Sequence, residues 1–192
     1  IEKKEVSEHL ENLMLRMSET TGSLSGILVV CAALAYAIAP ETMAKYNAQP
    51  GLWIHGQMGG GKTETVRRLM AIWGFLSTYD IPTLGEGTTA VAMDRLMSQY
   101  SSWAMHMDEF RESETSDAKL ASLRMGYNRQ SKKKGRLDQT KKTNSCTPLT
   151  MPMVSGESVT TDAATKSRFV CIAYSDEKRK GTPLEQADRY KN

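Results

Sequence analysis

The feature that most constrains the fold is a glycine-rich segment at residues 56–63, which reads G-Q-M-G-G-G-K-T. It follows a short apolar run at 52–55 and precedes a segment whose apolar residues recur at helical spacing. Glycines allow the backbone to turn tightly with its N–H groups facing inward, and such a nest at the start of a helix attracts anions. The pattern therefore predicts a strand, an anion-binding loop and a helix in succession.

Two polar side chains complete this loop. In the pattern G-x-x-x-x-G-K-[ST], known as the P-loop, the lysine reaches the β- and γ-phosphates of a nucleotide and the hydroxyl ligates Mg²⁺. Lys62 and Thr63 occupy these positions. We expect ATP and Mg²⁺ to bind at Gly56, Gln57, Met58, Gly59, Gly60, Gly61, Lys62, Thr63 and Glu64. A chance match to a glycine-rich loop is the alternative, and the strand-loop-helix context disfavours it.

A second candidate element is an apolar run at residues 103–109 that ends in two carboxylates. Together with a P-loop, Asp108 is the expected partner of the magnesium ion and Glu109 the group that polarises the attacking water. Phosphoryl transfer depends mainly on positioning and charge neutralisation, so loss of Glu109 should slow turnover more than it weakens nucleotide binding. A solvated acidic strand end is the alternative. His106 is expected to be an ordinary strand residue without chemistry.

The remaining patterns place this site in one domain, for which 192 residues provide enough chain to form a core. We expect helices at 1–19, 27–39 (stopped by Pro40), 62–77, 88–100 and 116–127, and strands at 52–55, 81–84, 103–107, 149–154 and 169–174. This alternation predicts an α/β fold, a parallel sheet flanked by helices. The expected divisions are a lead-in helix at 1–25, a core at 26–175, and a lid or tail that begins at 176–192.

Composition argues against several other classes of protein. Cys31, Cys146 and Cys171 are scattered without metal-ligand spacing, which disfavours a disulfide framework and a zinc site and favours the reducing cytoplasm. The most apolar stretch, 24–39, has about 16 residues, fewer than the roughly 20 of a membrane-spanning helix. We expect a buried helix and no membrane partner, with a membrane anchor as the weaker alternative. The chain opens on Ile1 and shows no signal peptide, so we expect an excised or processed part of a longer protein.

With these residues in place, the chain resembles the AAA+ ATPases. It is most similar to their helicase branch, which includes viral superfamily 3 and minichromosome-maintenance helicases, and to helicase-like proteins of phages and mobile genetic elements. The resemblance spans residues 26–174. Ser155, in M-V-S-G-E, matches sensor 1, a polar side chain that contacts the γ-phosphate or the water, although many relatives have Asn there. Arg168, in K-S-R-F, matches an arginine finger, which completes a neighbouring subunit's site. An ordinary turn and a surface arginine are the respective alternatives.

A basic stretch at 129–142 lies where members of the helicase branch insert a hairpin into the channel of the ring. It carries seven basic residues and a single acidic one, Asp138, whereas the net charge of the whole chain is only +3. The resemblance implies that DNA phosphates contact Lys132, Lys133, Lys134, Arg136, Lys141 and Lys142. Affinity should then fall steeply with salt. Only Tyr127 lies near in sequence, so base stacking is not expected; a solvated loop is the alternative.

The resemblance implies a motor, namely a ring-forming, hexameric ATPase that moves along single-stranded or forked DNA as a helicase of a phage or mobile element. The P-loop, Asp108 and Glu109 would act within one subunit and Arg168 on its neighbour. A second hypothesis is an ATP-dependent switch or loader-type scaffold that acts on protein partners without translocation. A small-molecule kinase is a third and weaker one. AAA+ proteins also carry a lid with a second sensor arginine, for which Arg179 and Arg189 are candidates.

Overall fold

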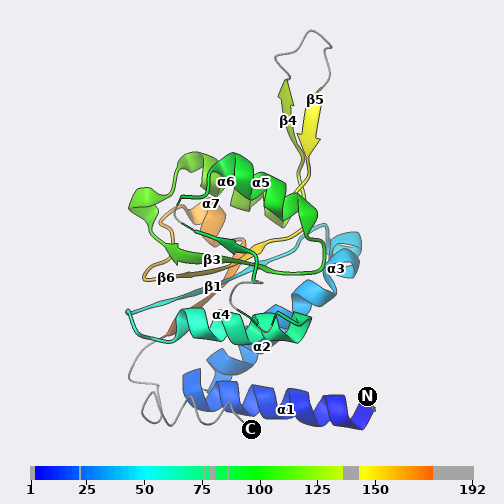
Figure 1. Cartoon of the computed structure of the whole chain (residues 1–192), viewed down its shortest axis with the longest axis vertical. Helices are drawn as coiled ribbons and strands as arrows, with labels where there is room; N and C mark the ends of the chain where they lie inside the picture. The colour runs from blue at the N-terminus through cyan, green and yellow to red at the C-terminus, as the bar shows by residue number, and fades with distance from the viewer. Residues whose placement is uncertain are drawn as a thin grey trace.

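A parallel sheet between two layers of helices forms the body of the molecule (Figure 1). This computed structural model describes residues 3–21, 23–75, 77, 81–85, 87–135 and 143–174. The proposed lid or tail at 176–192, with Arg179 and Arg189, lies outside these residues. So do Arg136, Lys141 and Lys142 of the basic stretch.

The sheet has five strands, which are β1 (Gly51–Gly56), β2 (Thr83–Leu84), β3 (Met105–Phe110), β6 (Pro152–Gly156) and β7 (Phe169–Tyr174). Their order is β2-β3-β6-β1-β7 and every pair is parallel. The predicted α/β fold with a parallel, helix-covered sheet is therefore confirmed. Because β6 lies between β1 and β3, the carboxyl ends of these three strands meet at one edge.

Helices cover both faces of the sheet, with α5 and α6 on one side and α2 and α4 on the other (Figure 1). The helices are α1 (Lys3–Thr21), α2 (Ser23–Ala37), α3 (Ala39–Tyr46), α4 (Lys62–Met70), α5 (Ala90–Gln99), α6 (Asp117–Tyr127) and the short α7 (Ala163–Lys166). Two 3₁₀ turns, η1 (Ala71–Trp73) and η2 (Glu112–Glu114), follow α4 and β3. The hydroxyls of Thr89 and Ser116 cap α5 and α6 by accepting hydrogen bonds from backbone N–H groups.

Two helix predictions are wrong in their extent. The predicted helix at 27–39 is instead α2, followed directly by α3, whose first turn contains Pro40. Proline fits a first helical turn because its missing N–H would have no partner there. The predicted helix at 62–77 ends as α4 at Met70, and Gly74 terminates the following 3₁₀ turn with a φ of 85°.

The amino-terminal helices pack against the sheet through buried side chains. Tyr36 of α2 is buried, donates a hydrogen bond to the carbonyl of Pro152 on β6, and accepts one from the N–H of Leu52 on β1. Trp53 of β1 is fully buried against Phe110 and Phe169, with ring centroids 4.5 and 5.0 Å away. Among the described helices, none is by itself long and apolar enough to cross a membrane. Residues 25–37 and α3 meet these criteria only as a pair, which is bent by 84°.

A two-stranded antiparallel hairpin projects from the body between α6 and β6 (Figure 1). It consists of β4 (Lys132–Gly135) and β5 (Thr143–Cys146), and Lys132 is paired with Cys146. The predicted basic hairpin is therefore confirmed as a hairpin, with Lys132, Lys133 and Lys134 on its first strand.

Candidate functional site

The glycine-rich loop joins β1 to α4 at the carboxyl edge of the sheet. Gly56 has a φ of 148°, and a Cβ atom there would lie 2.0 Å from the carbonyl oxygen of Tyr174, so only glycine fits. Gly61, with a φ of 74°, turns the chain directly into α4. The amino terminus of α4 therefore faces the cavity described below, with the partial positive charge that a helix start carries.

The ammonium group of Lys62 lies inside the loop. Its Nζ donates to the carbonyl oxygens of Gly56 and Gln57, at 2.8 and 2.6 Å. The residue is only 9% exposed. Since both acceptors are neutral carbonyls, an anionic phosphate oxygen entering the loop could replace them as the stronger partner.

Asp108, on β3, accepts hydrogen bonds from three groups at one oxygen, Oδ1. The donors are the hydroxyl of Thr63 at 3.0 Å, the hydroxyl of Ser155 at 2.6 Å and the N–H of Glu109 at 3.0 Å. Burial by itself would raise the pKa of Asp108, but these hydrogen bonds and the nearby His106 outweigh it and lower the pKa below its usual value. The carboxylate is therefore ionised at neutral pH.

His106 belongs to the same cluster, which the sequence analysis missed. Its Nε2 lies 2.9 Å from the Ser155 hydroxyl and 3.5 Å from Asp108 Oδ1. Burial lowers the pKa of His106 to about 4, so the ring is neutral. Because the Ser155 hydroxyl donates to Asp108, we assign the ring proton to Nε2, which donates to Ser155. The available signal was strand alternation, which places residues 106 and 108 on one face.

Glu109 has an unusual backbone conformation. Its φ is 53°, in the left-handed region, and the pairing of β3 with β6 shifts register between Met107 and Phe110. This bulge lies within β3, which runs to Phe110, whereas we expected a strand at 103–107 that ends in the acidic pair. Such a conformation costs a non-glycine residue about 1–3 kcal/mol, and residues that retain it cluster at functional sites.

A cavity of about 380 Å³ brings these elements together. Its lining comes from the loop, the start of α4 and the carboxyl ends of β3 and β6, and includes Met58, Gly59, Gly60, Gly61, Lys62, Thr63, Glu64, Asp108, Glu109 and Ser155. It also includes Arg67 and Arg111, two cationic residues that the sequence analysis did not single out. The cavity thus combines the glycine-rich loop and the start of α4 with three basic side chains, Lys62, Arg67 and Arg111, and four acidic ones, Glu64, Asp108, Glu109 and Glu157.

Arg168 is not part of this lining. It immediately precedes β7 and so lies at the amino edge of the sheet, opposite the loop. Its Nη1 donates to the carbonyl of Ala164, and its guanidinium lies 5.7 Å from the ring centroid of Tyr127. Lys132, Lys133 and Lys134 lie on β4 of the hairpin.

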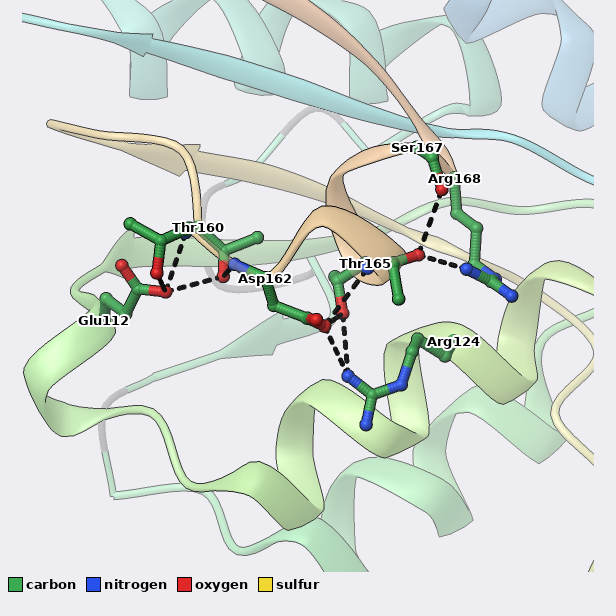
Figure 2. A network of polar contacts seen from close by, with 9 residues as sticks. Glu112, Arg124, Thr160, Asp162, Thr165, Ser167 and Arg168 are labelled. Carbon is green, nitrogen blue, oxygen red and sulfur yellow. Dashed lines mark hydrogen bonds and ion pairs between the residues drawn. The ribbon is translucent and has the colours of Figure 1, made fainter.

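A polar network on α6, α7 and the loop before α7 extends from the carboxyl edge towards Arg168 (Figure 2). Glu112, just after β3, accepts from the hydroxyl of Thr160 at 2.8 Å and from the N–H of Thr161 at 2.7 Å. Asp162 then caps α7 by accepting from the N–H of Thr165, and it pairs with Arg124 of α6. Glu112, which follows the acidic pair, is thereby linked to α7, whose Ala164 carbonyl accepts the hydrogen bond from Arg168.

Comparisons with protein-family models and with curated protein sequences give no match for this chain.

Proposed function

We propose that this chain is a P-loop ATPase that binds ATP with Mg²⁺ in the cavity at the carboxyl edge of the sheet. The observation that carries the proposal is the 3.0 Å hydrogen bond between Thr63, at the end of the glycine-rich motif, and Asp108 on β3. Two motifs far apart in the sequence thus present their oxygens to one cavity, beside the loop. A chance glycine-rich loop would not require a carboxylate at this place.

The residues present fit a magnesium ion. Mg²⁺ prefers oxygen ligands and is usually held by one or two carboxylates together with waters and substrate phosphates. Thr63 and Asp108 supply a hydroxyl and an ionised carboxylate, and they would hold the ion there. Mg²⁺, when bound, neutralises charge on the β- and γ-phosphate oxygens.

The remaining side chains suit hydrolysis of the γ-phosphate. Lys62 would exchange its two carbonyl acceptors for phosphate oxygens, and Arg67 and Arg111 would add positive charge near the developing negative charge. Glu109 is exposed within the cavity and would orient and polarise the attacking water. Ser155 would serve as sensor 1, since its hydroxyl is already held between His106 and Asp108.

At the level of the whole protein, we propose an AAA+ motor, a hexameric ring that moves along single-stranded or forked DNA as a helicase of a phage or mobile element. Two observations support it. Arg168 lies away from the cavity of its own chain, as a residue that serves a neighbour must, and the lysine-rich hairpin projects from the body. The alternative, an ATP-dependent switch or loader-type scaffold acting on protein partners, predicts hydrolysis that does not respond to DNA.

The test compares nucleotide binding and turnover in the wild type and two variants. Lys62→Ala should weaken ATP binding by about 10- to 100-fold, because it removes a charge-assisted hydrogen bond. Glu109→Gln should bind ATP almost as tightly as the wild type yet turn over about 10²- to 10⁴-fold more slowly. Glu41→Gln, which changes an exposed carboxylate on α3, is the control. Wild-type turnover in Glu109→Gln would refute the proposed role of this residue.

A further inference from the structure

We propose that Trp103 and Tyr100 form a stacking platform for the bases of single-stranded DNA at the foot of the β4–β5 hairpin. The inference rests on the proposed function in one respect only, namely that the protein acts on DNA. It adds a binding site for nucleobases, whereas the hairpin lysines suit phosphates. It also revises the expectation from the sequence, where no aromatic side chain except Tyr127 stood near the basic stretch.

The two rings are exposed to different degrees and lie close together. Trp103, in the turn before β3, is 47% exposed, which is unusual for the largest apolar side chain. Its ring centroid lies 6.3 Å from that of Tyr100, with 34° between the planes. Phe75 meets the indole from another side, at 5.4 Å and nearly perpendicular. Phe75 therefore supports the indole in a fixed orientation, while about half of the surface of Trp103 remains available to a ligand.

Trp103 is anchored beside the point where the hairpin returns to the sheet. Its carbonyl accepts a 2.7 Å hydrogen bond from the hydroxyl of Thr150, which lies just before β6. Three residues earlier in the chain, Thr147 contacts Ser131 through their hydroxyls and closes the foot of the hairpin. A single strand of DNA that follows the basic hairpin to its foot would therefore reach the indole of Trp103 next.

Charge at the same place favours a polyanion over an apolar partner. Arg129 enters the hairpin with a φ of 51°, and its Nη2 lies 3.5 Å from the carbonyl of Ser101, two residues before Trp103. Three lysines follow on β4. A cationic stretch beside an exposed aromatic ring is the combination by which proteins hold single strands, because the cations bind phosphates and any base can stack on the ring.

The two contributions respond differently to salt, which makes the site testable. Electrostatic contacts release counterions and set the slope of log affinity against log salt, whereas stacking does not. Trp103→Leu should therefore weaken binding of an oligothymidylate by on the order of tenfold at every salt concentration, with an unchanged slope. Changing Lys132, Lys133 and Lys134 together to Ala should instead reduce the slope.

Two controls separate stacking from a general effect of the substitution. Trp103→Phe keeps an aromatic ring and should retain most of the affinity. An abasic oligonucleotide of the same length offers phosphates without bases, so the wild type and Trp103→Leu should bind it equally. Trp103→Leu affinity equal to that of the wild type for oligothymidylate, or an equal loss for both oligonucleotides, would overturn the proposal. Circular dichroism of each variant verifies that it folds. Trp103→Phe should lose much less affinity for oligothymidylate than Trp103→Leu does, and this comparison remains informative if Trp103→Leu fails to fold.

Binding is measured without nucleotide, so its outcome is independent of the ATPase proposal. If the protein stacks bases on Trp103 but does not hydrolyse ATP, the stacking platform is supported and the ATPase proposal is refuted. If it hydrolyses ATP but binds no oligothymidylate at low salt, the ATPase proposal is supported and the stacking platform is refuted.

Discussion

Asp108 is the residue on which the hydrogen bonds of the candidate site converge. Its Oδ1 accepts from Thr63, Ser155 and the Glu109 N–H, and His106 fixes the Ser155 hydroxyl from the other side. These hydrogen bonds connect His106 to Ser155 and Ser155 to Asp108, and His106 and Ser155 are only 2% and 1% exposed. Buried polar groups are costly when they lose a partner, so this hydrogen-bonded series should contribute to stability as well as to function.

Ser155→Ala tests this arrangement. The change leaves the Nε2–H of His106 without its acceptor and removes a donor from Asp108, so the free energy of unfolding should fall by about 1–3 kcal/mol. ATP turnover should fall too. Ser122→Ala is the matched control, since Ser122 is also 1% exposed but donates to the Ala118 carbonyl of its own helix. Urea denaturation at pH 7 in EDTA should show a smaller loss of unfolding free energy for Ser122→Ala than for Ser155→Ala. A separate ATPase assay should give wild-type turnover for Ser122→Ala.

Equal losses of stability in the two serine variants, or unchanged turnover in Ser155→Ala, would contradict this assignment.

The left-handed backbone of Glu109 yields a second prediction at the residue scale. A side chain in this region costs roughly 1–2 kcal/mol, and glycine avoids the penalty while losing about 0.5–1 kcal/mol of backbone entropy. Glu109→Gly should therefore be more stable than Glu109→Ala by up to about 1 kcal/mol, although both lack the carboxylate and should hydrolyse ATP slowly. Thermal unfolding of the two variants decides the matter. Greater stability of Glu109→Ala would show that the left-handed conformation costs less free energy than the backbone entropy that glycine loses.

At the scale of elements, the polar network in Figure 2 joins segments that flank the cavity to α7. Glu112 holds the loop that follows Ser155, through Thr160 and Thr161, and Asp162 carries the connection to Thr165 and Arg124. Hydrogen bonds from Thr160 and Thr161 lower the pKa of Glu112. The network therefore fixes the path from the end of β3 to the helix that precedes β7.

This pKa shift makes the contribution of Glu112 dependent on pH. A carboxylate with a lowered pKa binds fewer protons when folded, so its stabilising effect is complete above the unfolded pKa of about 4.5 and is lost as pH falls through the lower folded value. The difference in unfolding midpoint between the wild type and Glu112→Gln should thus be larger at pH 6.5 than at pH 3.5. Denaturant titrations at both values measure it. Glu41→Gln, on α3, should show no such trend, and a Glu112→Gln difference that is independent of pH would refute the argument.

Elements with a clear period were predictable from the sequence, and those that depend on distant contacts were not. Each strand of the sheet coincides at least in part with a predicted apolar run, and α5 and α6 follow the predicted ranges because hydroxyl caps mark their starts. Helix α3 was missed because Pro40 satisfies the rule for ending one helix and the rule for starting the next. Helix α7 has four residues, too few to show a period.

The candidate site divides in the same way. Lys62, Thr63 and Asp108 could be placed from motifs that follow strands, since the carboxyl ends of parallel strands share an edge. The contact of His106 with Ser155 depends on the register of β3 against β6, in which His106 is paired with Met153. The bulge at Glu109 likewise has no sequence signal, because glutamate rarely adopts a positive φ.

At the scale of the whole molecule, the separation of Arg168 from the cavity limits what one copy of the chain can do. β7 spans six residues from Phe169 to Tyr174, so its ends are roughly 17–20 Å apart. Arg168 precedes the amino end, and the glycine-rich loop lies beside the carboxyl end, where Gly56 is paired with Tyr174. Any role of Arg168 at a nucleotide therefore requires the cavity of a second copy.

Mixing two inactive variants tests this division of labour. Lys62→Ala damages the cavity but keeps Arg168, whereas Arg168→Ala keeps the cavity and should slow turnover by several powers of ten. If Arg168 acts on a neighbour, random assembly of equal amounts places an intact cavity next to an intact arginine at about a quarter of the interfaces in a closed ring. Turnover of the mixture should rise towards that fraction of the wild-type rate, whereas each variant alone stays slow. Turnover no greater than the average of the separate variants, in a mixture whose mass confirms mixed assembly, would mean that Arg168 does not complete a neighbouring site.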